Sequence, residues 1–231
     1  MRIDKTPSVA AGIAQHRARL LLANRPGYLT YDYRMSTVWL VARTKSFDPD
    51  DAVAKAMDVF WRKGYARTTP QDLLDAIGIG RGSLYNAFAG KQDLFEQALR
   101  RYQAKETVRL IDLLDGPGSP RERVRAALTM VLDAACADPE RRGCLATNTA
   151  VELGDDDTVG LLVRRIFDRQ HDAFRGAVEE GQRAGEFSAD LDPRTAANFL
   201  LATINGMRVL AAADPDPARL AGLAETAMRA L

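Results

Sequence analysis

The chain has 231 residues, 46% of them hydrophobic, so it is long enough to bury a substantial core. Its 32 Lys and Arg residues nearly balance 31 Asp and Glu residues, which excludes a strongly basic or acidic protein and requires any nucleic-acid surface to be local. Two cysteines are too few for a disulfide framework. Apolar runs fall short of the roughly 20 residues of a membrane span, and arginines interrupt the only signal-like segment. We therefore expect a cytoplasmic protein with no membrane partner.

The first 46 residues differ from the rest of the chain. They carry eight Lys or Arg residues against two acids and no sustained amphipathic period. We expect residues 1–46 to be a basic, poorly ordered N-terminal extension. An equally good interpretation is that part of this segment precedes the natural start, at Met35 or Val41, and has no function.

Three short helices are predicted next. The first covers residues 48–64 and carries one apolar stripe. The second covers residues 69–77, where Thr69 has the side chain and position of an N-cap before a proline. A glycine turn at residues 78–80 leads into a third helix over residues 81–88. Together they predict a DNA-binding domain over residues 47–95 of the helix-turn-helix type.

The remainder of the chain is also predicted to be helical. A long helix over residues 91–114 leaves the first domain, and Gly and Pro residues at 116–120 mark a loop. Further helices are predicted over residues 121–137, 144–153, 158–184, 193–213 and 217–231. The fold class is therefore all-α, with an N-terminal three-helix helix-turn-helix domain followed by a helical ligand-binding and dimerisation domain at residues 96–231.

The third short helix has a polar outer face. Its inner ridge is Leu84 and Phe88, and the other side offers hydrogen-bonding groups for bases and phosphates from Arg81, Ser83, Tyr85, Asn86 and Lys91. This one-sided pattern is typical of a recognition helix that enters the major groove.

At these positions the sequence resembles the TetR family of repressors. The resemblance covers Asp50 to about Ala98 and rests on matches at Phe60, Gly64, Tyr65, Thr68, Thr69, Leu73, Leu74, Ile77, Gly78, Arg81, Gly82, Ser83, Leu84, Tyr85, Phe88, Lys91 and Leu94. The chain departs from the family pattern at Gly80, often a serine N-cap, and at Asn86, often histidine. Beyond Ala98 the resemblance rests only on helical pattern and length.

The resemblance implies a set of DNA contacts. Thr69 and Tyr85 would contact phosphates, Lys91 would pair with a phosphate, and Arg81, Ser83 and Asn86 would approach bases, with Gly82 on the same surface. The alternative is that Tyr85 is a half-buried core residue and Thr69 only a helix cap, and both roles can coexist.

The resemblance also implies a twofold dimer and a sensor. In the family the last long helices form a four-helix dimer interface, and the apolar stripes over residues 158–184 and 198–210 suit that role. The alternative is that these stripes only close the monomer core. Candidate effector contacts are Cys144, Asn148, Glu152, Phe174, Asn205 and Met207, whereas His171 is expected to be solvated or at an interface.

Cys144 follows Arg142 and Gly143 in a stretch that resembles a family subgroup with a Gly-Cys pair at the start of a sensor-domain helix, some members of which respond to electrophiles. A helix N-terminus and the neighbouring Arg141 and Arg142 would favour the thiolate. The alternative is that Cys144 is a small buried hydrophobic residue.

We therefore expect a repressor that binds a palindromic double-stranded DNA operator as a homodimer and is released by an unknown small-molecule or electrophile signal. The alternative is a DNA-binding activator or architectural protein without an effector, which an enclosed apolar cavity in the C-terminal domain would argue against. With two histidines and no paired catalytic groups, we expect no catalytic site, metal or cofactor, and Asp155 to Asp157 are interpreted as a solvated helix entry.

Overall fold

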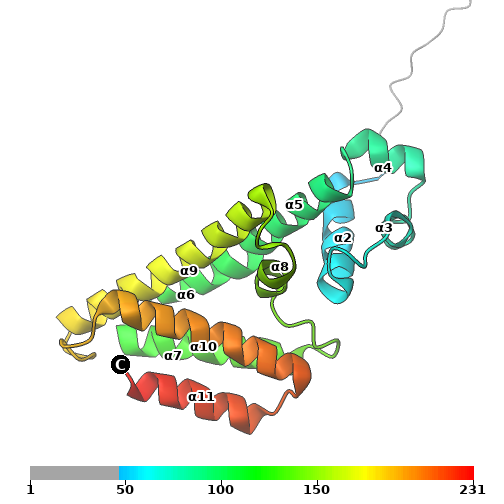
Figure 1. Cartoon of the computed structure of the whole chain (residues 1–231). Coiled ribbons are helices and arrows are strands. Elements are labelled where there is room, and N and C mark those ends of the chain that lie inside the picture. Colours follow the sequence, from blue (N-terminus) through cyan, green and yellow to red (C-terminus); the bar gives the residue numbers. More distant parts are fainter. Residues whose placement is uncertain (1–46) are drawn as a thin grey trace, which may run out of the picture. The chain divides into compact units, whose positions relative to one another are not determined.

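A computed structural model describes residues 47–231, and this part of the chain consists of helices and loops without a strand (Figure 1). The predicted all-α fold is confirmed, while the predicted basic extension lies outside the described residues. The helices are α2 (Pro49–Lys63), α3 (Pro70–Ile77), α4 (Arg81–Ala87), α5 (Lys91–Tyr102), a π-helical segment (Gln103–Thr107), α6 (Val108–Leu114), α7 (Pro120–Ala137), α8 (Leu145–Leu153), α9 (Asp157–Arg183), α10 (Pro193–Ala213) and α11 (Pro217–Arg229).

The first three helices begin and end where the sequence predicts. The Asp48 side chain caps α2 by accepting a hydrogen bond from the Asp50 backbone N–H at 2.9 Å. Thr69 and Asp72 form a reciprocal capping box at the start of α3. Gly78 ends α3 in the left-handed conformation, at a φ of 79°, which a residue with a Cβ rarely adopts.

The predicted single helix over residues 91–114 is wrong in one respect. The helical path continues, but Gln103–Thr107 is π-helical and separates α5 from α6. A π-helical turn bonds residue i to i+5 and needs neither Gly nor Pro, so the sequence carries no breaker to signal it.

The later helices follow the predicted pattern to within a few residues. Short polar side chains cap four of them, namely Ser119, Asp156, Asp192 and Asp216. Asp156 caps α9, in the segment Asp155 to Asp157 that was predicted to be the entry of this helix. Cys144 is itself the N-cap of α8, since the Thr147 backbone N–H donates to its Sγ at 3.4 Å.

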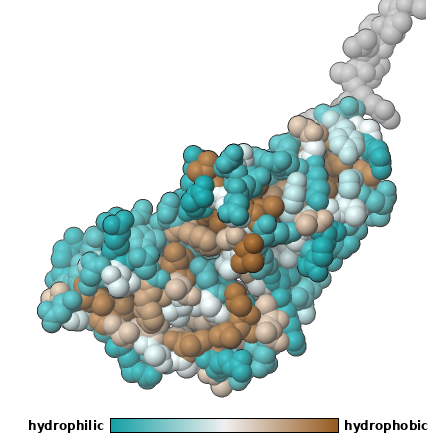
Figure 2. Space-filling model, viewed as in Figure 1, coloured by the Kyte–Doolittle hydropathy of each residue, from teal (hydrophilic) through white to brown (hydrophobic). Residues whose placement is uncertain are grey.

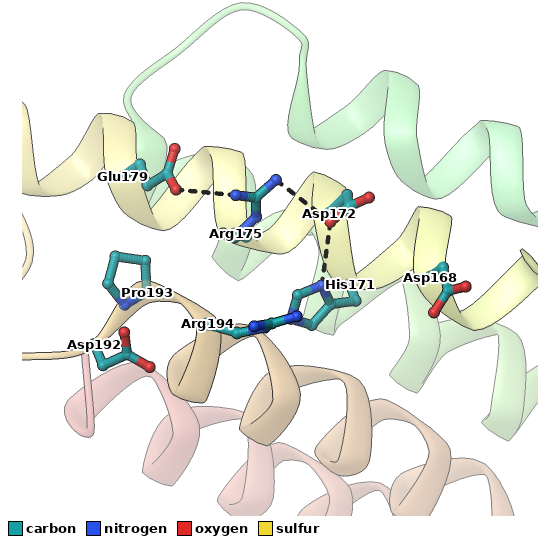
Figure 3. Close-up of a pocket in the computed structure, with 8 residues that line it drawn as sticks. All are labelled: Asp168, His171, Asp172, Arg175, Glu179, Asp192, Pro193 and Arg194. Atoms are coloured by element: carbon teal, nitrogen blue, oxygen red, sulfur yellow. Dashed lines mark hydrogen bonds and ion pairs between the residues drawn. The ribbon is translucent and has the colours of Figure 1, made fainter. Parts of the chain in front are cut away.

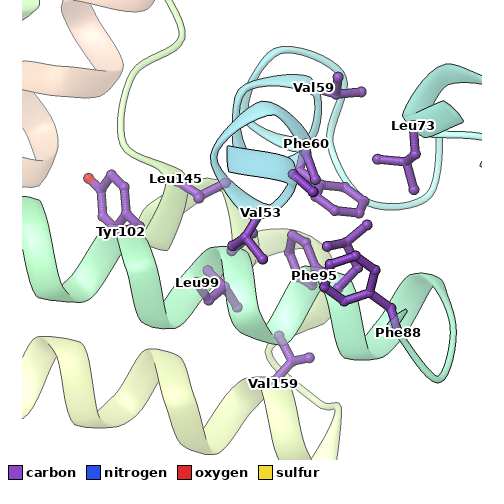
Figure 4. Close-up of a cluster of buried hydrophobic side chains, with 14 of the residues drawn as sticks. Val53, Val59, Phe60, Leu73, Phe88, Phe95, Leu99, Tyr102, Leu145 and Val159 are labelled. Carbon is purple, nitrogen blue, oxygen red and sulfur yellow. The ribbon is translucent and has the colours of Figure 1, made fainter. Parts of the chain in front are cut away.

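Two hydrophobic cores hold these helices together. The first core contains residues of α2, α3, α4 and α5 together with the start of α8 and of α9. Phe60 and Phe95 lie at its centre, with ring centroids 4.8 Å apart (Figure 4). The second joins α6, α7, α10 and α11 with the second half of α9. α9 contributes Ile166 to the first core and Phe174 to the second, so one helix links them.

We predict that Phe95→Ala lowers the free energy of unfolding by about 3–5 kcal/mol, because the ring is almost fully buried and its loss leaves a cavity. Denaturant unfolding at fixed protein concentration measures this. The control is Val151→Ala, at a side chain that is 87% exposed, where a change within about 0.5 kcal/mol is expected. Equal effects of the two substitutions would contradict the described core.

Candidate functional site

Helix α4 presents a polar face to solvent and an apolar face to the core. Leu84 and the following Phe88 are buried, whereas Arg81, Gly82 and Asn86 are exposed and Tyr85 is 50% exposed. Ser83 lies between these extremes. No acidic residue occurs within α4. The helix therefore offers a cation, an amide and hydroxyl groups on one open surface, which are the groups that read base edges and phosphates.

Thr69 and Lys91 flank this surface, and each already makes a contact within the protein. The Thr69 hydroxyl donates to the Asp72 carboxylate at 2.9 Å and accepts from the Asp72 backbone N–H at 3.2 Å. The Lys91 ammonium lies 4.2 Å from the centre of the Tyr65 ring, a cation–π distance. Partial burial lowers the pKa of Lys91, although the Glu152 carboxylate acts in the opposite direction.

Two polar connections tie the helix-turn-helix unit to the helices that follow it. The Glu152 carboxylate, at the end of α8, accepts from the backbone N–H groups of Tyr65 and Ala66 at 2.8 and 2.6 Å. On the other side of α2, the Trp61 indole N–H donates to the Gly143 carbonyl oxygen at 3.2 Å. Contacts from α8 and from the loop before it therefore reach both α2 and the loop that leads to α3.

Arg142 strengthens the second connection. Its guanidinium forms ion pairs with Asp58 of α2 at 2.7 Å and with Asp138 at 3.2 Å, and it lies 4.5 Å from the centre of the Trp61 ring. A third carboxylate, that of Glu140, lies 3.6 Å away, so Arg142 is occupied by three carboxylates and one aromatic ring.

The Cys144 thiol is buried, with 2% of the residue exposed, among donors from three elements. Its Sγ lies 3.2 Å from the Tyr102 hydroxyl and 3.7 Å from a guanidinium nitrogen of Arg208. Burial raises the pKa of Cys144, but Arg208 and the hydrogen bonds from Thr147 and Tyr102 outweigh it, so the pKa lies below its usual value. The sequence interpretation named the wrong cations, because Arg208 approaches the sulfur and Arg142 is held by carboxylates.

The other predicted effector residues are dispersed. Asn148 donates to the Arg142 carbonyl oxygen at 2.9 Å, and Asn205 accepts from the Thr147 hydroxyl at 2.9 Å, so both lie near the start of α8. Glu152 is at the opposite end of that helix. Phe174 and Met207 are fully buried in the second core. The structure therefore brings Cys144 near Asn148 and Asn205 but does not gather the six residues around one space.

A cavity of about 390 Å³ lies between α2, the π-helical segment, α7 and α10. Its apolar lining includes Met57, Trp61 and Val131, and its polar lining includes Tyr102 and Arg208. Trp61, Tyr102 and Arg208 were not predicted as cavity residues from the sequence. One signal was present, since Arg208 is the only charged residue between Thr195 and Ala213.

A second, open groove of about 640 Å³ follows α9 and the start of α10 (Figure 3). His171 lies here, 3.3 Å from the Asp172 carboxylate, and Arg175 pairs with Asp172 and Glu179. Apart from Pro193, charged or titratable side chains line this groove, and it lacks the apolar walls typical of a small-molecule site. We interpret the groove as a solvated surface, while the prediction that His171 is solvated or at an interface stays a prediction.

α10 exposes an unusual amount of apolar surface. Val209 is 55% exposed and Phe199 43%, and Leu210 is also exposed. By length and composition α10 is apolar enough to resemble a membrane span, and much of it is not buried within the described residues. Hydrophobic residues gather over the part of the surface where α10 and α11 run (Figure 2). Because single exposed apolar residues are ordinary but a contiguous patch is not, this face is a candidate interaction surface.

The helix-turn-helix geometry and the open polar face of α4 define a DNA-binding protein of the helix-turn-helix class. Residues 52–98 match the family model for bacterial regulatory proteins of the tetR family, and residues 120–228 match the tetracyclin repressor-like C-terminal domain. The chain is 32% identical over 186 residues to the HTH-type transcriptional regulator YezE of Bacillus subtilis, covering 78% of this chain and 94% of the relative. This chain belongs to the TetR family of transcriptional regulators.

Further relatives agree with this assignment. The HTH-type transcriptional repressor DhaR of a Mycobacterium species is 31% identical over 157 residues, covering 67% of this chain and 77% of the relative. Among solved structures, a cysteine mutant of the TetR family regulator CifR, complexed with 26-bp double-strand operator DNA, is 32% identical with a TM-score of 0.73, covering 80% of this chain and 97% of that chain.

We predict that acid weakens the start of α3 through Asp72. A hydrogen bond from Lys63, followed by bonds from the Thr69 backbone and side chain, lowers the pKa of Asp72 from 3.8 to about 2. Because the folded-state pKa is depressed, this contribution is present above about pH 4 and is lost as the pH falls toward 2. Thermal midpoints of Asp72→Asn should depend less on pH in this window than those of the unmodified chain. Parallel curves would contradict the capping box.

Proposed function

We propose that this chain is a repressor that binds a palindromic operator as a homodimer through α4 and loses affinity when its C-terminal helices bind an effector. The observation that carries the proposal is the open polar face of α4, backed by the buried Leu84 and Phe88. We keep the division into a DNA-binding domain at residues 47–95 and a sensor and dimerisation domain at residues 96–231. Because it acts on DNA in a bacterial family, we place the protein in the cytoplasm.

Within this proposal the residues around α4 have separate roles. Arg81, Ser83 and Asn86 approach base edges, because Arg suits guanine and Asn suits adenine, and Gly82 lets the helix approach the duplex closely. Tyr85, Lys91 and Thr69 contact phosphates. The Thr69 hydroxyl would then hydrogen-bond both a phosphate and the Asp72 carboxylate of the α3 cap.

The second copy binds through α10, one of the two helices whose apolar stripes predict the dimer interface. Two recognition helices must sit about one DNA turn apart to read a palindrome, so dimerisation is part of the mechanism. The exposed apolar residues Phe199, Val209 and Leu210 support α10 as the contact, since a symmetric interface uses the same patch from both subunits.

Effector release would work through the connections between the two domains. A ligand that favours another position of α8 or of the loop before it would alter the Glu152 and Arg142 contacts and hence the separation of the two α4 helices. Membership of the Gly-Cys subgroup stays a proposal. The lowered pKa of Cys144 favours reaction with an electrophile, whereas its burial opposes access, so the protein would have to open first.

We predict that substitutions on α4 separate base reading from phosphate contact. The probe is a duplex selected from a random pool by the unmodified protein, and fluorescence anisotropy measures its affinity. Arg81→Ala and Asn86→Ala should each cost about 1–3 kcal/mol on the selected duplex and relax specificity. Tyr85→Ala should weaken selected and scrambled duplexes alike.

The control for the DNA experiment is Arg183→Ala, which removes one exposed positive charge in the last turn of α9, outside the helix-turn-helix unit. Its affinity should stay close to that of the unmodified protein. Unchanged affinity in a folded Arg81→Ala, Asn86→Ala double variant would refute α4 as the recognition helix.

We predict that Val209→Glu abolishes dimerisation, because it places a charge in a buried apolar interface. Light scattering after size-exclusion chromatography should give the dimer mass for the unmodified protein and the monomer mass for the variant. Val151→Glu, at another exposed valine but on α8, is the matched control and should remain dimeric. A dimeric Val209→Glu variant would rule out this face.

A further inference from the structure

The cavity between α2, the π-helical segment, α7 and α10 carries an excess of positive charge. Five basic residues line it, namely Lys105, Arg109, Arg141, Arg142 and Arg208, against three acidic ones, Asp58, Glu106 and Asp138. Two of these acids, Asp58 and Asp138, are paired with Arg142. Five basic side chains against three acidic ones leave an excess of two positive charges in the lining, so the cavity favours an anion.

Arg208 is the basic residue best placed to receive that anion. Its side chain is partly buried, and among residues 47–231 its only side-chain hydrogen bond goes to the Cys144 sulfur at 3.7 Å. No ion pair joins it to a carboxylate within the described part of the chain. A guanidinium has five N–H donors and stays protonated, so most of the hydrogen-bonding capacity of Arg208 is unused.

The rest of the lining suits a small organic group. Trp61, Met57, Val131 and several alanines form apolar wall, and the Tyr102 hydroxyl lies beside the same sulfur that Arg208 contacts. The volume of about 390 Å³ lies at the lower end of the roughly 300–1,000 Å³ of small-molecule sites. A bare inorganic ion would leave this apolar wall uncovered.

We propose that this cavity binds a small carboxylate with an apolar body, whose carboxylate pairs with Arg208 and whose hydrocarbon part packs on Trp61 and Met57. A carboxylate matches the planar fork of a guanidinium with two parallel hydrogen bonds. The π-helical segment supports the assignment, since it contributes Lys105 and Glu106 to the lining and such segments are frequent at functional sites.

This inference gives the proposed effector its chemical class and rests on the proposed function for its regulatory meaning. The ligand would touch α2 through Trp61 and Met57, and the indole of Trp61 also holds the Gly143 carbonyl oxygen. A bound carboxylate would therefore compete for, or reposition, the contacts that join α2 to the loop before α8.

Isothermal titration calorimetry of the full chain without DNA tests binding itself. The probes are propionate, hexanoate, octanoate and benzoate, each compared with its uncharged amide, and inorganic phosphate. We expect at least one carboxylate to bind about tenfold or more tightly than its amide and than phosphate. Absence of binding by every carboxylate, equal binding of acid and amide, or equal binding of phosphate would overturn the proposal.

Substitutions then locate the site. Arg208→Gln should remove the preference for the acid over the amide, and Arg208→Lys should restore part of it. Arg183→Gln, which removes an arginine outside the cavity, should bind as the unmodified chain does. A preference for the acid over the amide that survives Arg208→Gln would overturn the assignment of Arg208. If Arg208→Gln does not fold, the comparison of acid and amide on the unmodified chain still tests the proposed site.

A second experiment measures the affinity of the protein for the selected duplex in the presence of the carboxylate that binds most tightly. It distinguishes the proposed carboxylate site from the proposed effector release. Carboxylate binding without any change in DNA affinity would refute effector release while leaving the carboxylate site in place. No carboxylate binding, together with specific DNA binding, would refute the site while leaving the DNA-binding function.

Discussion

The burial of one face of α4 is the constraint on which the DNA-binding surface depends. Leu84 and Phe88 pack into a core built around Phe60 and Phe95, so a helix of only seven residues is held with its opposite face in solvent. A short helix of this kind is marginal on its own in water. Its orientation therefore comes from tertiary packing, and the polar residues that face outward need no structural contacts of their own.

Under the proposed function, the same core would couple the C-terminal helices to that surface. Residues from the start of α8 and α9 belong to the core around α2 and α5, and polar contacts from Glu152 and Arg142 reinforce the junction. Packed interfaces shift between discrete arrangements more readily than they deform. The Arg208 cavity is lined in part by α2, the helix against which α4 is supported. A ligand in this cavity would therefore contact the support of α4 directly.

The helices and the exposed polar face of α4 were predictable because local signals specify them. Thr69 before Pro70, Gly78 at a left-handed turn and Asp192 before Pro193 are caps and breaks that act through neighbouring residues. The cavity was not predictable, because Trp61, Tyr102 and Arg208 are far apart in sequence and only packing brings them together. The π-helical segment was missed for a related reason, since no residue type marks it.

The central claim is that two α4 helices, one from each subunit, enter the major groove of one operator. Methylation interference at guanine N7, which faces the major groove, tests it most directly on the selected duplex. The account predicts two symmetric clusters of interfering guanines separated by about 10 base pairs or a multiple of that repeat. A single cluster, or no interference at N7 despite tight binding, would contradict it.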